Sequence, residues 1–204
     1  MFHCRLGLGF SLILSVAFVQ AKDFQGAFVS DNGFDHVVIH KRHVQASAIS
    51  ASGNLCNVDG DYKSGGVVVA SRECQFKLIP LANGGFKIDL PNDSGCDAFC
   101  GANVSISGEY KPVPPACENQ RFERSLAVYR SQHHQQQYET AYQTFSKTLS
   151  LCKPFIDFLT HDKAASELSL SFKQLGRGPD CQNLLSQTRA YGKTEAELKE
   201  YYPP

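Results

Sequence analysis

The positions of the cysteines constrain the fold of this chain more than any other feature of its sequence. After a hydrophobic N-terminal leader come seven of them, Cys56, Cys74, Cys96, Cys100, Cys117, Cys152 and Cys181. The first four lie among short alternating segments, the fifth follows a proline-rich segment, and the last two lie where apolar residues recur at helical spacing. The cysteines therefore predict a β half and a helical half, each held by disulfides.

The leader, residues 1–21, has the organisation of a secretory signal peptide. A basic start from Met1 to Arg5 precedes an apolar run from Leu6 to Val19, and small residues stand at Val19 and Ala21. A membrane anchor is the alternative, but a run of about fourteen residues is shorter than the roughly twenty that span a bilayer as a helix. We expect cleavage after Ala21 and a periplasmic or secreted mature chain that does not insert into the membrane.

Export makes disulfides the expected fate of these cysteines. We expect a bond between Cys56 and Cys74, which flank two β segments, and a bond between Cys152 and Cys181. The second would close a loop of about thirty residues and stabilise the helical half by roughly 3 to 4 kcal/mol. Other connectivities remain open, because cysteine spacing alone does not determine pairing.

The odd number of cysteines leaves at least one thiol without a partner in the mature chain. We expect Cys117 to pair with Cys96 or Cys100 across the proline-rich segment, so the odd thiol is expected among these three. A partner cysteine in an extension beyond Pro204 is one explanation. Zinc held by the Cys96-x-x-x-Cys100 spacing and two other thiols is an alternative to disulfides.

Residues 22–110 have the pattern of a small antiparallel β domain. Phe76 to Leu78 and Phe86 to Leu90 alternate apolar and polar residues, which is typical of strands with one buried face. Glycine- and asparagine-rich turns separate the segments at intervals of about ten residues. The expected strands cover residues 27–29, 36–40, 44–49, 67–70, 74–79, 86–90 and 104–110. This spacing predicts a meander that forms a barrel or a sandwich.

Three prolines within residues 111–115 predict an extended linker, and the period changes to that of helices in residues 116–204. Apolar spacing predicts one helix around Phe122 to Tyr129, a second from Tyr138 to Cys152, and a third that ends near Gly176. Asp180 is expected to cap a fourth helix, and a short fifth helix is expected after Thr194. The overall prediction is an α+β chain.

Little in the sequence points to catalysis or to a bound cofactor. Lys plus Arg and Asp plus Glu both total 20, so net charge does not favour nucleic acid as a partner. Asp157 and Asp162 are too poorly spaced on a helix to form a pair of catalytic carboxylates. A strand places His36 and His40 on one face and His43 on the other, unless the intervening turn re-aims it. We predict no catalytic residue, metal or cofactor.

The helical half resembles the helical hairpins of tetratricopeptide repeats over residues 119–189. Tyr138-Glu139-Thr140-Ala141, followed by Phe145 and by Pro154, is similar to the second helix of such a repeat. A second copy has Leu175-Gly176, then Cys181 in the place of the alanine and Leu185 in the place of the aromatic residue. The two copies are 40 residues apart, whereas the family usually has 34, and the family's first-helix motif is missing. The resemblance implies a stack of helix pairs that contacts proteins.

The whole arrangement is similar to bacterial exported envelope proteins described as lysozyme-inhibitor-like. The residues that carry this resemblance are Cys100, Gly101, Ser105, Gly108 and Tyr110, after a signal peptide and before a helical tail. No inhibitory loop of that family can be matched residue by residue. The resemblance implies a protein that occludes an enzyme's cleft rather than turning over a substrate.

Tyrosines are the candidate contacts for such a partner, because they are large, rigid and tipped with a polar group. The candidates in amphipathic or terminal segments are Tyr138, Tyr142, Tyr191, Tyr201 and Tyr202. Packing within the chain is the alternative role for them. The sequence thus predicts an exported, non-enzymatic protein that binds another protein. An immunity protein that neutralises a toxin, a structural envelope component and a hydrolase are the alternatives, and the oligomeric state stays open.

Overall fold

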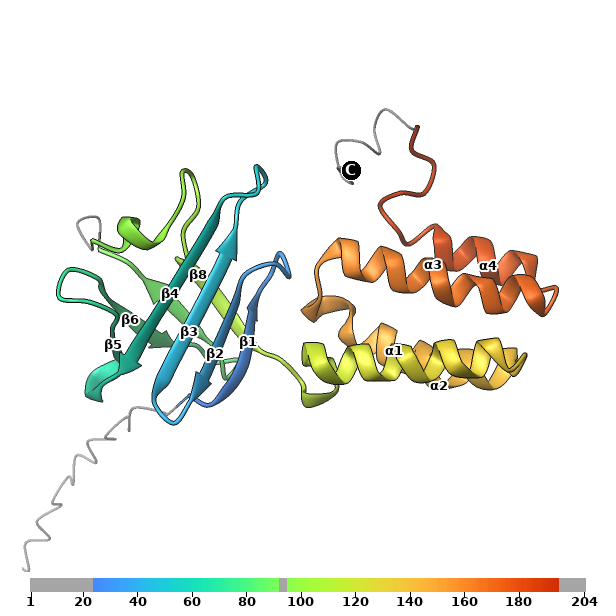
Figure 1. Cartoon of the computed structure of the whole chain (residues 1–204), viewed down its shortest axis with the longest axis horizontal. Helices are drawn as coiled ribbons and strands as arrows, with labels where there is room; N and C mark the ends of the chain where they lie inside the picture. The colour runs from blue at the N-terminus through green and yellow to red at the C-terminus, as the bar shows by residue number, and fades with distance from the viewer. Residues whose placement is uncertain (1–23, 92–94, 195–204) are drawn as a thin grey trace, which may run out of the picture.

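The computed structural model describes residues 24–91 and 95–194, in which a β-barrel is followed by a helical half (Figure 1). The expected signal peptide and the expected helix after Thr194 lie outside these residues. The strands are β1 Gly26–Ser30, β2 His36–His40, β3 His43–Ile49, β4 Leu55–Tyr62, β5 Val67–Val69, β6 Gln75–Pro80, β7 Phe86–Asp89 and β8 Gly108–Pro112. The helices are α1 Asn119–His134, α2 Tyr138–Cys152, α3 Phe158–Gln174 and α4 Gly178–Leu185. The α+β prediction is confirmed.

The strands form a closed antiparallel barrel in which each strand pairs with the next along the chain. β1 closes the barrel against β8, with Phe28 opposite Pro112 and Ser30 opposite Tyr110. The meander prediction is therefore confirmed as a barrel, not a sandwich. Closure leaves no open sheet edge along β1 and β8 where another chain could add a strand.

Strand β4 was not expected from the sequence, although it alternates exposed and buried residues along its whole length. Its inward residues are Cys56, Val58, Gly60 and Tyr62, of which Val58 and Tyr62 are typical of strands, whereas Gly60 is not. Gly60 is required here, because a Cβ on it would lie 2.9 Å from Val68 Cγ1 and from the Val69 carbonyl oxygen. Because β4 is rich in acidic and small residues, its sequence does not indicate a strand.

The boundary between the two halves also differs from the prediction. Strand β8 begins at Gly108 and ends at Pro112, whereas a strand was expected over residues 104–110 and a linker over residues 111–115. Lys111 and Pro112 pair with β1, and a further backbone hydrogen bond runs from Val113 N to Ala27 O over 2.9 Å. Proline is tolerated at this strand end because it does not need to donate to the ladder there.

Aromatic side chains fill one part of the barrel interior. The Phe86 ring lies 4.7 Å from Phe28, 4.9 Å from Phe24 and 5.6 Å from Tyr110, measured between ring centroids. All four side chains are buried. Tyr110 donates a hydrogen bond from its hydroxyl to Ile106 O over 2.8 Å, so its polar group is satisfied inside the barrel. An eight-stranded barrel is just wide enough for side chains to fill it, as they do here.

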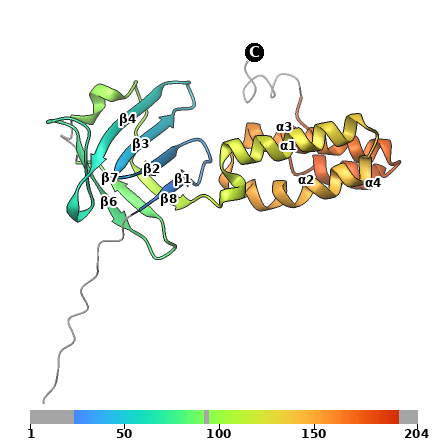
Figure 2. The same cartoon turned by 60° about the horizontal axis from the view of Figure 1, so that its bottom comes forward.

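In the helical half, α1 and α2 form one antiparallel hairpin and α3 and α4 form a second (Figure 2). Phe122 and Phe145 join α1 to α2, with ring centroids 5.5 Å apart. Tyr129 packs on Phe145 and donates its hydroxyl to the Glu167 carbonyl oxygen, which ties α1 to α3. Arg130 adds a two-pronged ion pair to Glu167, with both N···O distances 2.6 Å.

The disulfides pair Cys56 with Cys100, Cys74 with Cys96 and Cys117 with Cys152, so the expected pairings are wrong. Cys56 lies in β4, and Cys74 lies directly before β6. In the sheet, β5 lies between these two strands. The two cysteines therefore cannot reach each other within the meander.

The expected bond between Cys152 and Cys181 fails for a similar reason. Cys152 ends α2, whereas Cys181 lies in the first turn of α4. Because α3 runs antiparallel to both helices, these positions fall at opposite ends of the helical half. Cys152 instead meets Cys117, just before α1, with 5.2 Å between their Cα atoms. Cys181 carries the free thiol of the described residues, rather than a cysteine of the barrel or Cys117.

Helix capping was predicted at the wrong aspartate. Asp157 caps α3, because its carboxylate accepts hydrogen bonds from Thr160 N over 2.9 Å and from the Thr160 hydroxyl over 2.7 Å. Asp180 is not a cap but lies inside the first turn of α4, where it accepts from Arg177 Nε over 2.7 Å.

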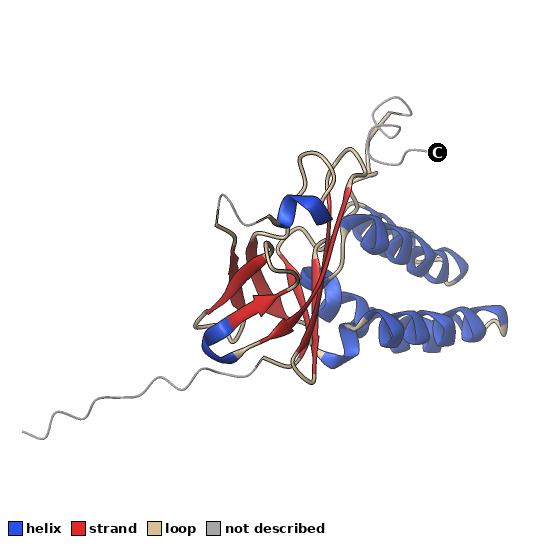
Figure 3. Ribbon diagram, turned by 60° about the vertical axis from the view of Figure 1, so that its left-hand side comes forward, coloured by secondary structure: helices blue, strands red, loops and turns tan. Residues whose placement is uncertain are grey.

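The long helices extend from one side of the barrel (Figure 3). The two halves touch where the β1–β2 loop meets the start of α3. Phe34 packs edge-on against Phe158, with ring centroids 5.6 Å apart. A Cβ on Gly33 would lie 2.5 Å from the Ile156 carbonyl oxygen, so glycine alone permits this approach. Lys111 bridges the same region through an ion pair with Asp31 and a position 5.6 Å from the Phe155 ring. Within the described residues, no helix has the length and apolar character needed to cross a bilayer.

Candidate binding sites

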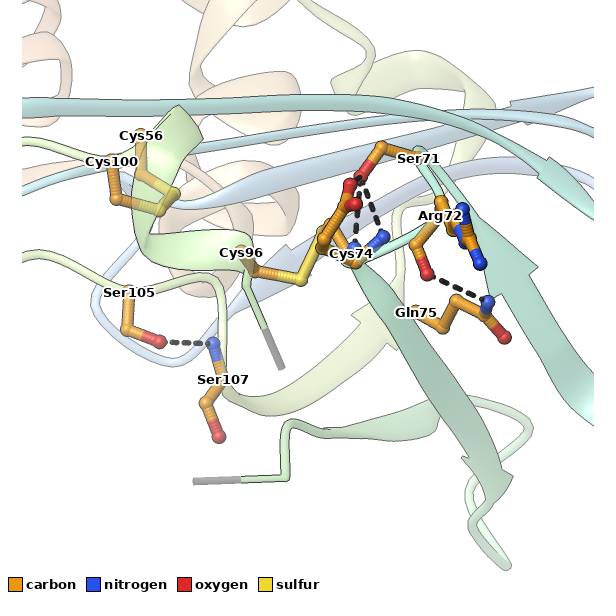
Figure 4. The surroundings of a disulfide bond; sticks show 10 residues. Cys56, Ser71, Arg72, Cys74, Gln75, Cys96, Cys100, Ser105 and Ser107 are labelled. Atoms are coloured by element: carbon orange, nitrogen blue, oxygen red, sulfur yellow. Dashed lines mark hydrogen bonds between the residues drawn. A yellow bond between two sulfur atoms is a disulfide. The ribbon is translucent and has the colours of Figure 1, made fainter. Parts of the chain in front are cut away.

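Two disulfides brace one end of the barrel and the segment between β7 and β8 (Figure 4). The Cys56–Cys100 bond fixes this segment beside β4. Gly101 N donates to Leu55 O over 2.8 Å, and Asn54 Nδ2 donates to Ala102 O over 2.9 Å. This end of the barrel therefore offers a backbone shape held by covalent bonds and hydrogen bonds.

The second disulfide anchors the other side of the same segment. Cys74 and Cys96 are buried, and their bond joins the start of β6 to a short 3-10 helix, Cys96–Phe99. The Ser71 hydroxyl accepts from Cys74 N over 2.9 Å and so fixes the turn before β6. Cys96 and Cys100 are both engaged in disulfides, so neither is available as a thiolate for the zinc alternative.

Three apolar side chains are exposed around the Cys56–Cys100 bond, and we call them the rim patch: Ile49, Leu55 and Phe99. Leu55 is 56% exposed, which makes it the most exposed of the three. Ile49 lies directly opposite Leu55 across β3 and β4. Leu55 and Phe99 each precede a cysteine of the disulfide, and alternation along β4 turns Leu55 to the face opposite the buried Cys56. Exposed apolar groups on a rigid frame are typical of protein-binding surfaces.

A cavity of about 250 Å³ lies in the helical half between α2, α3 and α4. Leu149, Leu168 and Phe172 contribute apolar walls, and Ser146 and Asn183 contribute polar ones. The sequence analysis missed this site. The signal available in the sequence was the short, polar α4, which is too small to cover α2 and α3 completely.

Basic side chains mark both ends of this cavity. At one end the Arg177 guanidinium lies 4.8 Å from the Phe172 ring centroid and 5.7 Å from that of Tyr142. Arg177 is paired with Asp180 over 2.7 Å and with Glu139 over 3.4 Å, and the hydrogen bond to Asp180 raises the pKa of Arg177 further. At the other end lies Lys153, whose Nζ is 3.4 Å from Gln187 Oε1.

His161 lines the Lys153 end of the cavity and is held by its neighbour. Its Nδ1 lies 3.1 Å from Asp162 Oδ1, and the other oxygen of Asp162 accepts from Arg189 N over 2.7 Å. Asp162 is therefore a buried orienting group, and Asp157 is a helix cap. The two aspartates have separate structural roles rather than one shared catalytic role.

The three strand histidines all lie on the outer face of the barrel. His43 lies opposite His40, because a two-residue turn with φ of 47° and 68° reverses the chain and re-aims it. His43 Nε2 lies 3.7 Å from Asp59 Oδ1. His36 lies near Asp157 and Asp35, and its partial desolvation lowers its pKa below the ordinary value. In the described part of the chain, no group of three or more potential ligands is placed to hold a metal ion.

Three of the tyrosines proposed as partner contacts lie in the described residues, two of them one turn apart in α2. Tyr138 packs edge-on against His133 at 5.0 Å, and Tyr142 packs on Phe172 at 4.5 Å, so both are partly used inside the helical half. Tyr191 is 52% exposed. Tyr201 and Tyr202 lie outside the described residues. Their role in partner binding remains a prediction, and the rim patch is the surface that sequence reasoning missed.

Comparison with protein-family models, with curated proteins and with solved structures finds no significant match for this chain. The three disulfides seen in the described residues are of the kind that form in oxidising compartments, outside the cytosol.

Proposed function

We propose that this chain is an exported, non-enzymatic protein that binds another protein through the rim patch, in the periplasm or outside the cell. The observation that carries the proposal is the exposure of Ile49, Leu55 and Phe99 around the Cys56–Cys100 bond. Burying apolar side chains drives association, and a surface that is already rigid loses little conformational freedom on binding.

The filled barrel supports a role for its outer surface rather than its interior. The side chains that β1, β2, β3 and β4 turn inward are buried, and aromatic rings pack near the β1–β8 seam. A packed interior leaves the barrel's rim and loops to make contacts with a partner. Loops on a rigid scaffold commonly carry binding functions.

The most concrete form of this proposal is inhibition of a lysozyme by occlusion. Support comes from the resemblance at Cys100, Gly101 and Tyr110, since the first two residues lie in the braced segment next to the rim patch. The tetratricopeptide-like character of the helical half belongs to the same proposal. Two successive helix hairpins support it, and such hairpins would add a second protein-contact surface.

An immunity protein that neutralises a toxin would use the same surface in the same way. A structural component of an envelope assembly would bind a larger complex instead. These alternatives differ in the partner and in stoichiometry, so one capture experiment separates them.

The test uses the mature chain as bait, in oxidised form and after reduction. We expect the oxidised bait to retain one protein at 1:1 stoichiometry and the reduced bait to lose it, because reduction frees the braced segment. A captured muramidase that loses activity identifies a lysozyme inhibitor, a captured toxin identifies an immunity protein, and co-fractionation with a large membrane complex identifies an envelope role. Failure of both baits to retain any protein would overturn the proposal.

A further inference from the structure

The cavity in the helical half is a second candidate site, separate from the rim patch. Tyr142 and Lys153 lie at its two ends, eleven residues apart in and just after α2, which corresponds to about 16 Å along a helix. Its volume of about 250 Å³ is below the roughly 300 to 1,000 Å³ of pockets for drug-sized ligands. The cavity therefore suits a small, elongated molecule.

Arg177 closes the Tyr142 end of the cavity. Asp180 and Glu139 already compensate its charge, at 2.7 and 3.4 Å, and the Phe172 ring covers one side of the guanidinium. Because these contacts also join α4 to α2, the Arg177 guanidinium acts as a structural clasp. An anionic ligand would have to compete with two carboxylates at this end.

Lys153 makes the opposite end different. Within the described residues its one polar contact is the neutral amide of Gln187, at 3.4 Å, and it makes no ion pair with a carboxylate. The neighbouring His161 is held by Asp162 at 3.1 Å. Of the basic side chains that line the cavity, Lys153 alone lacks a carboxylate partner in this part of the chain. The Lys153 end therefore favours an anion.

The walls between the two ends have a mixed character. Leu149, Leu168 and Leu184 provide apolar surface, whereas Ser146 and Asn183 provide a hydroxyl and an amide. Ser146 is half-buried and Asn183 is exposed, so a purely aliphatic ligand would displace water from both groups without replacing its hydrogen bonds. The walls thus favour a ligand that combines an apolar body with one hydrogen-bonding group.

We propose that this cavity binds a small amphipathic carboxylate. Its apolar body lies on Leu149 and Leu168, an amide-like group meets Ser146 and Asn183, and its carboxylate pairs with Lys153. N-acetyl-L-leucine has these three features in about twelve non-hydrogen atoms, for which a Kd of roughly 1 mM is expected. N-acetyl-L-leucinamide has the same shape without the charge and is the matched control ligand.

The test is an NMR titration of backbone amides in the mature, oxidised chain. We expect N-acetyl-L-leucine to shift amide signals of α2, α3 and α4 around the cavity, and the neutral amide to bind about two- to fivefold more weakly, because Lys153 is exposed and its ion pair is screened by water. The proposal is overturned if no saturable shifts appear up to about 10 mM, if the shifts lie on the barrel, or if the acid and the amide bind equally well.

Substitutions test the role of Lys153. Lys153→Gln is expected to weaken binding of the acid about two- to fivefold and to leave binding of the amide unchanged. Lys147→Gln is the matched control, because Lys147 is exposed on α2, six residues before Lys153, does not line the cavity, and its replacement changes the net charge equally. Equal loss in both variants would contradict a specific pairing. Leu55→Asp at the rim should leave this titration unchanged, so the cavity and the rim patch can fail independently.

Discussion

The barrel and the helical half differ in how completely they bury their apolar side chains. In the barrel each strand has a neighbour on both sides, and closure between β1 and β8 completes the enclosure. In the helical half each helix packs mainly on the next one along the chain, and the eight-residue α4 covers its neighbours only in part. Closure thus leaves the barrel with a packed interior, whereas the open stack retains a cavity.

The largest effect on stability is expected from the barrel interior. Phe86→Ala removes a fully buried ring that contacts Phe24, Phe28 and Tyr110, and should lower the free energy of unfolding by about 4 to 5 kcal/mol. Urea unfolding followed by the near-UV dichroism of the aromatic residues measures the change. Phe155→Ala, at a half-buried site outside the barrel, is the control. An equal loss of stability in both variants would show that side chains are not more completely buried in the barrel interior than in the helical half.

The next effect is expected from the clip of the helical half. Replacing Cys117 and Cys152 together by Ala opens a 35-residue separation and should lower the free energy of unfolding by about 3 to 4 kcal/mol. Amide exchange should accelerate in α1 and α2 and stay slow in the barrel. Cys181→Ala, which removes the free thiol, should change neither. Faster exchange in the barrel would show that the two parts unfold as one unit.

A smaller effect is expected at Tyr110, where burial raises the pKa of the phenol above its usual value. A folded pKa above the unfolded one gives stability that is complete below about pH 10 and declines as the pH rises further. Tyr110→Phe should reduce this alkaline decline, leaving the part that comes from the raised pKa of the buried Tyr129, and should cost about 1 kcal/mol at pH 7 because Ile106 O loses its donor. Unfolding curves at several pH values measure both changes. The exposed Tyr191→Phe should change neither, and an unaltered alkaline decline in Tyr110→Phe would contradict the assignment.

The smallest effect on stability is expected where the two halves meet. Asp157→Ala removes the N-cap of α3 beside Gly33 and should destabilise the helical half by about 0.5 to 1 kcal/mol. Thermal unfolding followed by far-UV circular dichroism measures it. Asp157→Asn, which keeps a capping oxygen, should restore most of the loss. No difference between the two variants would show that the cap is not the stabilising contact.

The parts of the fold that could be predicted were those where one period dominates. Alternation at residues 86–90 and helical spacing from Tyr138 to Cys152 indicated the correct elements. Strand β4 could not be found in this way, because its buried positions include Gly60 and Cys56 and its exposed positions include the apolar Leu55. Missing β4 led to the wrong pairing of Cys56 with Cys74, since a strand cysteine's partner depends on which strands are neighbours.

The candidate sites were harder to predict than the elements. The rim patch depends on Cys100 meeting Cys56 across 44 residues, and the cavity depends on how much of α2 and α3 the short α4 covers. Neither the contact between Cys56 and Cys100 nor the extent to which α4 covers its neighbours can be predicted from the local spacing of residues. The turn at Lys41 and Arg42 is a further example. Simple alternation places His43 on the opposite face from His40, but the positive φ values at both turn residues put the two histidines on the same face.

The most direct test of the proposed function is the affinity of the captured partner for three versions of the chain: wild type, Leu55→Asp and Val128→Asp. Leu55 and Val128 are both exposed apolar residues, on the rim and on α1 respectively, so each change should alter stability by only about 0.5 kcal/mol. We predict that Leu55→Asp weakens binding at least about a hundredfold, because it puts a charge inside the apolar contact, and that Val128→Asp binds like wild type. Equal affinity of Leu55→Asp and wild type would contradict binding through the rim patch.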